Sequence, residues 1–267
     1  MLANMLRSLW RRATSPVAAS LSDNDSYPVA CARAARDSRL FACFRSEAAY
    51  THILEHVGAD LGAKYLRLLA ADRVIMEALD EFRRNDDYGG PQTVDYPGVG
   101  RFSPTTLRYI KVLKDLKTYF GSLDAMRICE IGVGYGGQCR VIHAVCQPAA
   151  YVLVDLPQAL LLAQRYLSNF SLPHAPVACS MAQLAAADYG LVISNYAFTE
   201  LTREIQDEYL SKVILRAQRG YITYNEITPP SYRSYRAEEL LAMIPGARRL
   251  PEAPLTHPAN CIIQWGS

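Results

Sequence analysis

The chain has 267 residues, of which 50% are hydrophobic and 20% charged, the composition of a globular protein that can bury a sizeable core. Its formal net charge of +2 comes from 28 basic and 26 acidic side chains, so charge gives no reason to expect a nucleic-acid partner. No apolar run approaches the ~18 residues that a membrane-spanning helix needs, and we expect no stable membrane insertion.

The seven cysteines lack the spacing of a metal site or a disulfide framework. They contain no CxxC pair, and no cluster of histidines accompanies them. Most lie in or beside apolar segments, so we interpret them as small buried hydrophobic residues in a reducing compartment. We therefore expect a cytoplasmic location, and the lack of clustered acids predicts no bound metal.

Residues 1–45 are expected to be a poorly ordered or loosely packed N-terminal segment. The first 22 residues contain three arginines and no acid, with apolar residues between them, which leaves open an interfacial helix or a targeting segment. A frayed terminus is the preferred interpretation, because the apolar stretch is too short and no cleavage site is convincing.

Residues 46–122 are expected to form a helical region. Apolar residues between positions 61 and 82 recur mostly at spacings of three and four, the period of an amphipathic helix. Ser103 and Pro104 then predict the start of another helix, with serine as its cap and proline in its first turn, and Gly121 predicts its end. The sequence leaves open whether these helices dimerise or cover a substrate.

A long loop interrupts this helical region at residues 85–101, which hold four glycines and two prolines. The glycines and Tyr88 are typical of a lid over a substrate, and a flexible connector is the alternative.

From residue 123 onward, strand-like runs alternate with helical ones. This alternation, with almost continuously apolar strands, predicts a parallel sheet covered on both faces. The predicted strands are 126–131, 150–155, 175–179, 190–194, 219–224 and 260–265, and the predicted helices lie near 136–147, 157–169, 203–218 and 236–244.

The junction after the first of these strands carries the strongest functional signal. The strand ends at Glu130, a glycine-rich turn follows, and the next strand ends in Asp155. Gly132, Gly134 and Gly137 fit the G-x-G-x-x-G pattern of a dinucleotide site, with Asp155 placed to contact a ribose. Glu130 favours S-adenosylmethionine instead, because its carboxylate would repel a pyrophosphate but attract the cationic amino group of a methionine moiety.

Five segments resemble a known family. The E-x-G-x-G motif is similar to that of class I S-adenosylmethionine-dependent methyltransferases, and the joint set more narrowly resembles the sugar O-methyltransferase family. This resemblance covers roughly residues 85–267, and we expect a doubly wound, Rossmann-like, mostly parallel seven-stranded sheet with helices on both faces, preceded by the helical region. The matching segments are Ser103–Tyr109, Glu130–Gly137, Val154–Pro157, Ser194–Leu201 and Pro254–Asn260.

The resemblance implies a cofactor site in the domain at 123–267. Its glycines would let the backbone approach the methionine end of the cofactor, near Glu130, while Asp155 would accept hydrogen bonds from the ribose hydroxyls. Arg108 could bind the methionine carboxylate or an anionic sugar, or could be a solvated helix residue. The residues assigned to the cofactor are Glu130, Gly132, Gly134, Gly136, Asp155, Ser180, Met181, Ser194 and Arg108.

Asn195 and Tyr196 end the fourth strand of the domain, where they would border the transferring methyl group. Methylation of a sugar hydroxyl also needs a general base, for which His257 is preferred and Glu226 is the rival. Tyr88 and Tyr109 are assigned to substrate binding.

The sequence therefore predicts an enzyme, an O-methyltransferase that transfers a methyl group from S-adenosyl-L-methionine to a hydroxyl of a sugar or glycosylated small molecule. The alternatives are a phenolic or other natural-product acceptor, an NAD-dependent oxidoreductase, and a non-catalytic nucleoside-binding protein.

Overall fold

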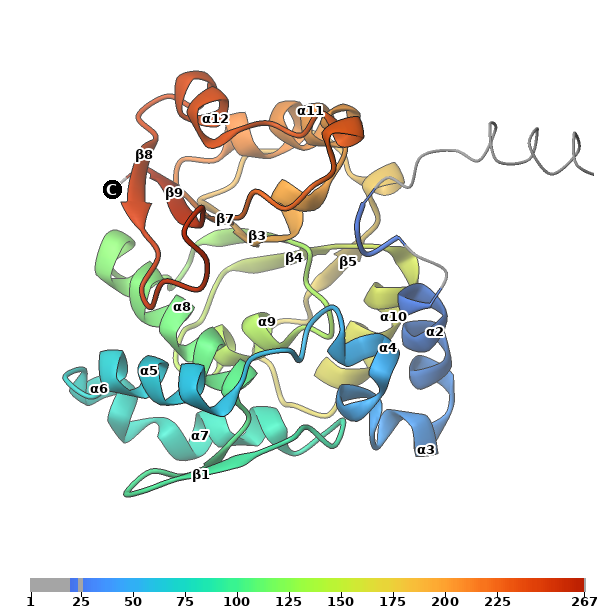
Figure 1. Cartoon of the computed structure of the whole chain (residues 1–267), viewed down its shortest axis with the longest axis vertical. Helices are drawn as coiled ribbons and strands as arrows, with labels where there is room; N and C mark the ends of the chain where they lie inside the picture. Colours follow the sequence, from blue (N-terminus) through green and yellow to red (C-terminus); the bar gives the residue numbers. More distant parts are fainter. Residues whose placement is uncertain (1–19, 24–25, 267) are drawn as a thin grey trace, which may run out of the picture.

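The structure, a computed structural model, describes residues 20–23 and 26–266. Most of the basic N-terminal segment therefore lies outside the described residues. The chain builds a seven-stranded sheet in the order β5-β4-β3-β6-β7-β9-β8 (Figure 1). The strands are β3 (Arg127–Ile131), β4 (Ala150–Val154), β5 (Val177–Cys179), β6 (Leu191–Asn195), β7 (Gly220–Tyr224), β8 (Arg248–Pro251) and β9 (Cys261–Trp265).

The predicted doubly wound, mostly parallel seven-stranded sheet is confirmed. Strands β5, β4, β3, β6 and β7 run parallel, and β9 joins antiparallel between β7 and β8. The strand order reverses at β3, which lies between β4 and β6, so the carboxyl ends of these strands form the topological switch point of the sheet. Doubly wound sheets bind their ligands at this point.

Helices cover both faces of the sheet because its strands bury side chains on both faces. Ile128 belongs to one apolar core and its neighbour Cys129 to the other, as alternation along a strand requires. Figure 1 shows α8, α9 and α10 below the sheet and α11 and α12 above it. Their bounds are α8 (Pro104–Phe120), α9 (Gly137–His143), α10 (Pro157–Leu167), α11 (Arg203–Lys212) and α12 (Ala237–Met243).

The expectation of a loosely packed segment up to residue 45 is wrong for residues 27–41. These residues form α2 (Tyr27–Arg36) and α3 (Ser38–Phe41), and α2 packs along α10. Tyr27 and Cys31 are buried there, because they lie on the same face of α2 one turn apart. This region is thus part of the folded domain.

The predicted helical region is built from short helices. Many of the regularly spaced apolar residues between positions 61 and 82 are buried, as expected. They do not form one long helix, because turns divide the region, for example between α5 and α6. The elements are η1 (Phe44–Ser46), α4 (Ala48–Thr51), α5 (Ala59–Leu69), α6 (Arg73–Glu77), α7 (Leu79–Arg83) and η2 (Arg84–Asp86). Helix α8 begins and ends where the sequence predicts, since Ser103 Oγ accepts a hydrogen bond from Thr106 N at 3.1 Å and the helix stops before Gly121.

The segment predicted as a loop at 85–101 contains a small β-hairpin. Strands β1 (Val94–Tyr96) and β2 (Gly100–Phe102) pair antiparallel, and Tyr96 and Phe102 are buried. Within the described residues, no helix is long and apolar enough to cross a membrane.

Candidate functional site

The glycine turn lies at the carboxyl end of β3 and leads into α9. Gly132, Gly134 and Gly136 have φ values of 78°, 56° and 87°, a region that side-chain-bearing residues rarely adopt. A Cβ on Gly132 would lie 1.9 Å from the Cβ of Ala197, so only glycine fits there. The turn therefore places backbone without side chains of its own at the switch point in strand order.

Asp155, directly after β4, is bound to this turn. Its Oδ2 accepts a hydrogen bond from Gly134 N at 2.9 Å, and its Oδ1 accepts one from Leu156 N at 2.7 Å. Burial raises the pKa of this carboxyl to about 6, although the backbone N–H groups act in the opposite direction. Each carboxylate oxygen retains a lone pair, so Asp155 can still accept hydrogen bonds from a diol.

Glu130 lies in the sheet just before the turn and is 2% exposed. Its Oε2 accepts a hydrogen bond from the Tyr151 hydroxyl at 2.7 Å. Burial raises the pKa of Glu130 to about 8, and the Tyr151 hydrogen bond offsets part of this effect. Glu130 is thus a buried acid that a nearby cation would ionise.

Residues from the N-terminal region cover the glycine turn. The Cδ1 of Leu54 lies 2.6 Å from where a Cβ on Gly134 would be, and the Tyr50 hydroxyl lies 3.7 Å from the same point. The Tyr50 hydroxyl is buried and has no hydrogen-bond partner among the described residues. It is a donor available to a ligand placed over the turn.

A second group of predicted residues meets at a small cavity of about 20 Å³. It lies between α8, the carboxyl ends of β6 and β7, and the segment after β8. Arg108, Asn195 and Tyr196 line it, and the structure therefore brings together three predicted site residues from two distant segments. Its other lining residues are Tyr65, Lys111, Val112, Tyr221, Thr223, Glu252, Ala253, Pro254 and Ile262.

Glu252 is the site residue that the sequence reasoning missed. It is buried, and it accepts hydrogen bonds from the Tyr196 hydroxyl and, at 2.8 and 2.6 Å, from the N–H and hydroxyl of Thr256. Burial raises the pKa of Tyr196, and Glu252 raises it further. No local pattern marks Glu252, since it reaches Tyr196 only through the pairing of β8 and β9 with the sheet.

The two predicted bases lie elsewhere. His257 and Glu226 are exposed, and neither lines the 20 Å³ cavity. The Nδ1 of His257 accepts a hydrogen bond from Ala259 N at 3.2 Å. The structure thus places no predicted base beside Tyr196.

The side chains of three predicted cofactor residues, Ser194, Ser180 and Met181, contact other parts of the protein. Ser194 Oγ donates to Ile131 O at 3.1 Å and accepts from Phe198 N at 3.0 Å, which joins β6 to β3. Ser180 caps η3 (Met181–Gln183), and Met181 packs against the apolar core on the α11 side.

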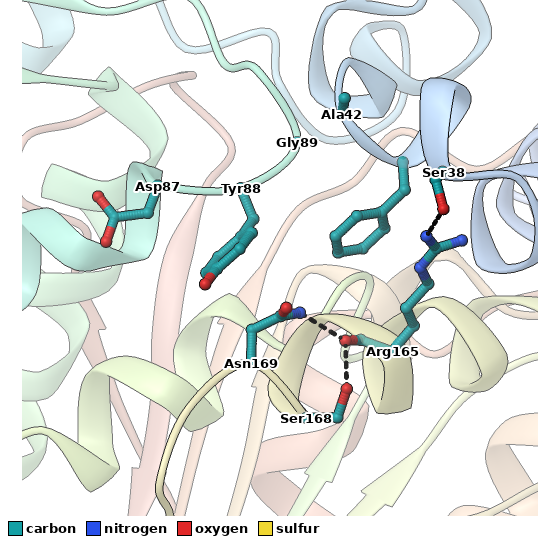
Figure 2. A pocket seen from close by; sticks show the side chains of 9 residues that line it. Ser38, Ala42, Asp87, Tyr88, Gly89, Arg165, Ser168 and Asn169 are labelled. Atoms are coloured by element: carbon teal, nitrogen blue, oxygen red, sulfur yellow. Dashed lines mark hydrogen bonds between the residues drawn. The ribbon is translucent and has the colours of Figure 1, made fainter.

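Tyr88 and Tyr109 lie apart from each other. Tyr88 lines a cavity of about 400 Å³ with Arg165 and Asn169, at the carboxyl end of α10 (Figure 2). Asp155 precedes the opposite end of that helix, so Tyr88 is not part of the site at the glycine turn. Tyr109 is buried, with its ring packed against that of Tyr135.

No protein-family model matches the chain, and no curated protein matches it. Solved structures with a similar chain path include magnesium protoporphyrin IX methyltransferase from Synechocystis PCC 6803 with bound SAM, at 15% identity and a TM-score of 0.45 over 78% of this chain and 97% of that one. A SAM-dependent methyltransferase from Aquifex aeolicus has 16% identity and a TM-score of 0.43 over 59% and 88%. The pyocyanin biosynthetic protein PhzM has 13% identity and a TM-score of 0.42 over 61% and 57%. Likeness at this level says nothing about a substrate.

Proposed function

We propose that this protein is an S-adenosylmethionine-dependent O-methyltransferase that acts on a hydroxyl of a sugar or glycosylated small molecule. The observation that carries the cofactor assignment is the contact between Asp155 and the N–H of Gly134, 2.9 Å from its Oδ2. This contact sets a carboxylate beside the glycine turn at the switch point of the sheet, where a ribose and its neighbouring groups would bind.

The residues around the turn fit this cofactor. Asp155 would accept from the ribose hydroxyls, the Tyr50 hydroxyl would donate to a polar group over Gly134, and the buried Glu130 would stabilise the ammonium group. A dinucleotide fits less well, because its pyrophosphate would raise the pKa of Glu130 further and find no charge partner there, whereas an ammonium group would ionise Glu130 and pair with it. Leu54 must withdraw from Gly134 before any ligand can approach the turn.

When bound, S-adenosylmethionine supplies an electrophilic methyl group, so the protein must align an acceptor hydroxyl and remove its proton. We assign the proton transfer to Tyr196 and Glu252 in place of His257. The Tyr196 hydroxyl would take the acceptor's proton as it gives its own to Glu252. The assignment of a sugar acceptor rests on the resemblance of the five sequence segments.

The proton-transfer assignment is tested by Glu252→Gln. This change keeps the shape of the side chain but removes the proton acceptor, so we expect methyl transfer to fall by roughly 10²–10⁴ with unchanged affinity for S-adenosylhomocysteine. His257→Ala is the matched control and should retain activity. If His257→Ala lost activity and Glu252→Gln retained it, His257 would be the general base and our assignment would be wrong.

The cofactor is tested by calorimetric titration of the protein with S-adenosylhomocysteine and, separately, with NADH. We expect S-adenosylhomocysteine to bind and NADH not to bind. Asp155→Ala should weaken binding by roughly 10- to 100-fold, because hydrogen bonds to a charged acceptor are lost. Asp155→Asn retains one acceptor oxygen and should lose less.

Binding of NADH alone would refute the methyltransferase assignment. Unchanged affinity in Asp155→Ala would show that the ribose binds elsewhere.

A further inference from the structure

Arg108 is a buried cation whose side chain makes no ion pair with any described residue. Its side chain projects from the second turn of α8, and the residue is 8% exposed. Within residues 20–23 and 26–266 its side chain forms no hydrogen bond or ion pair, and its Nε is a buried donor without a partner. Such a group costs folding free energy, which a bound anion would offset.

Arg45 shows how this protein treats a buried guanidinium that serves structure alone. Its Nε donates to Glu55 at 2.6 Å, and its Nη1 donates to Asp86 at 3.0 Å. Its Nη2 donates to the Ser103 hydroxyl at 2.9 Å. Arg45 is thus paired with two carboxylates, whereas the side chain of Arg108, at similar burial, makes no ion pair in the part of the chain that the structure describes.

The surroundings of Arg108 are aromatic and polar. Its guanidinium carbon lies 5.6 Å from the ring centre of Tyr109 and 5.9 Å from that of Tyr196. The neighbouring carboxylate of Glu252 is already bound by Tyr196 and Thr256. The guanidinium thus has two aromatic neighbours and no hydrogen-bond acceptor among the described residues, and its planar set of donors would suit a planar anion.

We propose that Arg108 binds a carboxylate of the methyl acceptor, so that the substrate is an acidic sugar or a comparable carboxylated molecule. The inference rests on the proposed function, since it names the acceptor of that reaction. A volume of about 20 Å³ suits a single small group, and the cavity is lined by Asn195 and Tyr196, where the acceptor is expected. None of the proposed cofactor residues Glu130, Gly134 and Asp155 lines it, so we assign Arg108 to the acceptor and not to the cofactor.

The test follows the Nε–H resonance of Arg108 in ¹⁵N-labelled full-length protein saturated with S-adenosylhomocysteine. Arg108→Lys identifies the resonance by its loss and retains the charge, which limits the effect on folding. D-glucuronate, D-glucose and D-glucose 6-phosphate are titrated at constant ionic strength, because they share a ring and differ in their charged group. We expect glucuronate alone to shift the resonance and to bind roughly tenfold or more tightly than glucose.

In Arg108→Lys, glucuronate affinity should fall roughly tenfold, since lysine cannot bind a carboxylate in bidentate fashion. Affinity for S-adenosylhomocysteine should be retained. Equal binding of glucose and glucuronate, a response to glucose 6-phosphate alone, or no response to glucuronate would overturn the inference. The inference would also be overturned if S-adenosylhomocysteine itself shifted the Arg108 resonance and bound more weakly to Arg108→Lys, because Arg108 would then bind the cofactor.

The titrations are repeated without S-adenosylhomocysteine. If that molecule fails to bind the unaltered protein, the proposed function fails, while the response of Arg108 to glucuronate still decides whether the cavity binds a carboxylate.

Discussion

At the scale of single residues, Glu130 is a buried acid of the site whose pKa is strongly raised. Its pKa is raised from 4.5 to about 8 by burial. Because the folded protein holds this proton more tightly than the unfolded chain, the contribution to stability is complete below pH 4.5 and is lost as the pH rises towards about 8. The cofactor-free protein should therefore lose stability across this range.

Glu130→Gln mimics the protonated side chain and should remove this dependence. We expect the variant to match the unaltered protein at pH 5 and to exceed its stability at pH 8 by on the order of 3 kcal/mol. Thermal unfolding at both pH values measures the difference. Exposed Glu77, paired with Arg73, supplies the control Glu77→Gln, which should show no such trend. A difference that is constant with pH would contradict the burial argument.

The candidate site was predictable where its residues are close in the sequence. Glu130, the glycines and Asp155 belong to one strand–turn–helix–strand unit, so local pattern is enough to relate them. Glu252 contacts Tyr196 across 56 positions of sequence, and only the assembled sheet brings them together. Arg108 could be identified as a candidate, but its lack of an ion pair among the described residues is visible only in the folded structure.

At the scale of elements, the buried parallel strands were predicted within a few residues because they are continuously apolar. Strand β8 was not predicted, because it lies at the edge of the sheet and carries the exposed residues Arg248 and Arg249. One of the breaks between the short N-terminal helices, the one before α6, could have been predicted from the sequence. The Asp72 side chain caps α6 by accepting from Ile75 N at 3.1 Å, and aspartate is a favoured helix start.

At the scale of the whole molecule, Arg45 joins parts of the chain that are remote in sequence. It is 0% exposed and binds Glu55, Asp86 and Ser103, which lie near α4, in η2 and at the start of α8. The N-terminal region and the sheet domain are therefore expected to unfold together.

Arg45→Met should destabilise the protein by about 3–5 kcal/mol, because it leaves two buried carboxylates without a counter-charge. Urea denaturation measures the loss. The matched control is Arg73→Met, whose ion pair with Glu77 is exposed and should contribute less than about 1 kcal/mol. Equal effects of the two variants would show that the Arg45 contacts do not hold the regions together.

Arg45 also lies between the two proposed ligand sites, the glycine turn and the 20 Å³ cavity that Arg108 lines. Leu54, which lies over Gly134, directly precedes Glu55, and Ser103 caps the helix that carries Arg108. Because Arg45 contacts both Glu55 and Ser103, we expect displacement of Leu54 by a ligand on the glycine turn to affect the first turn of α8. If a ligand on the glycine turn changes the affinity of the Arg108 cavity for its ligand by some factor, the ligand in the cavity must change the affinity of the turn by the same factor. Paired titrations in both orders should then return a single coupling free energy.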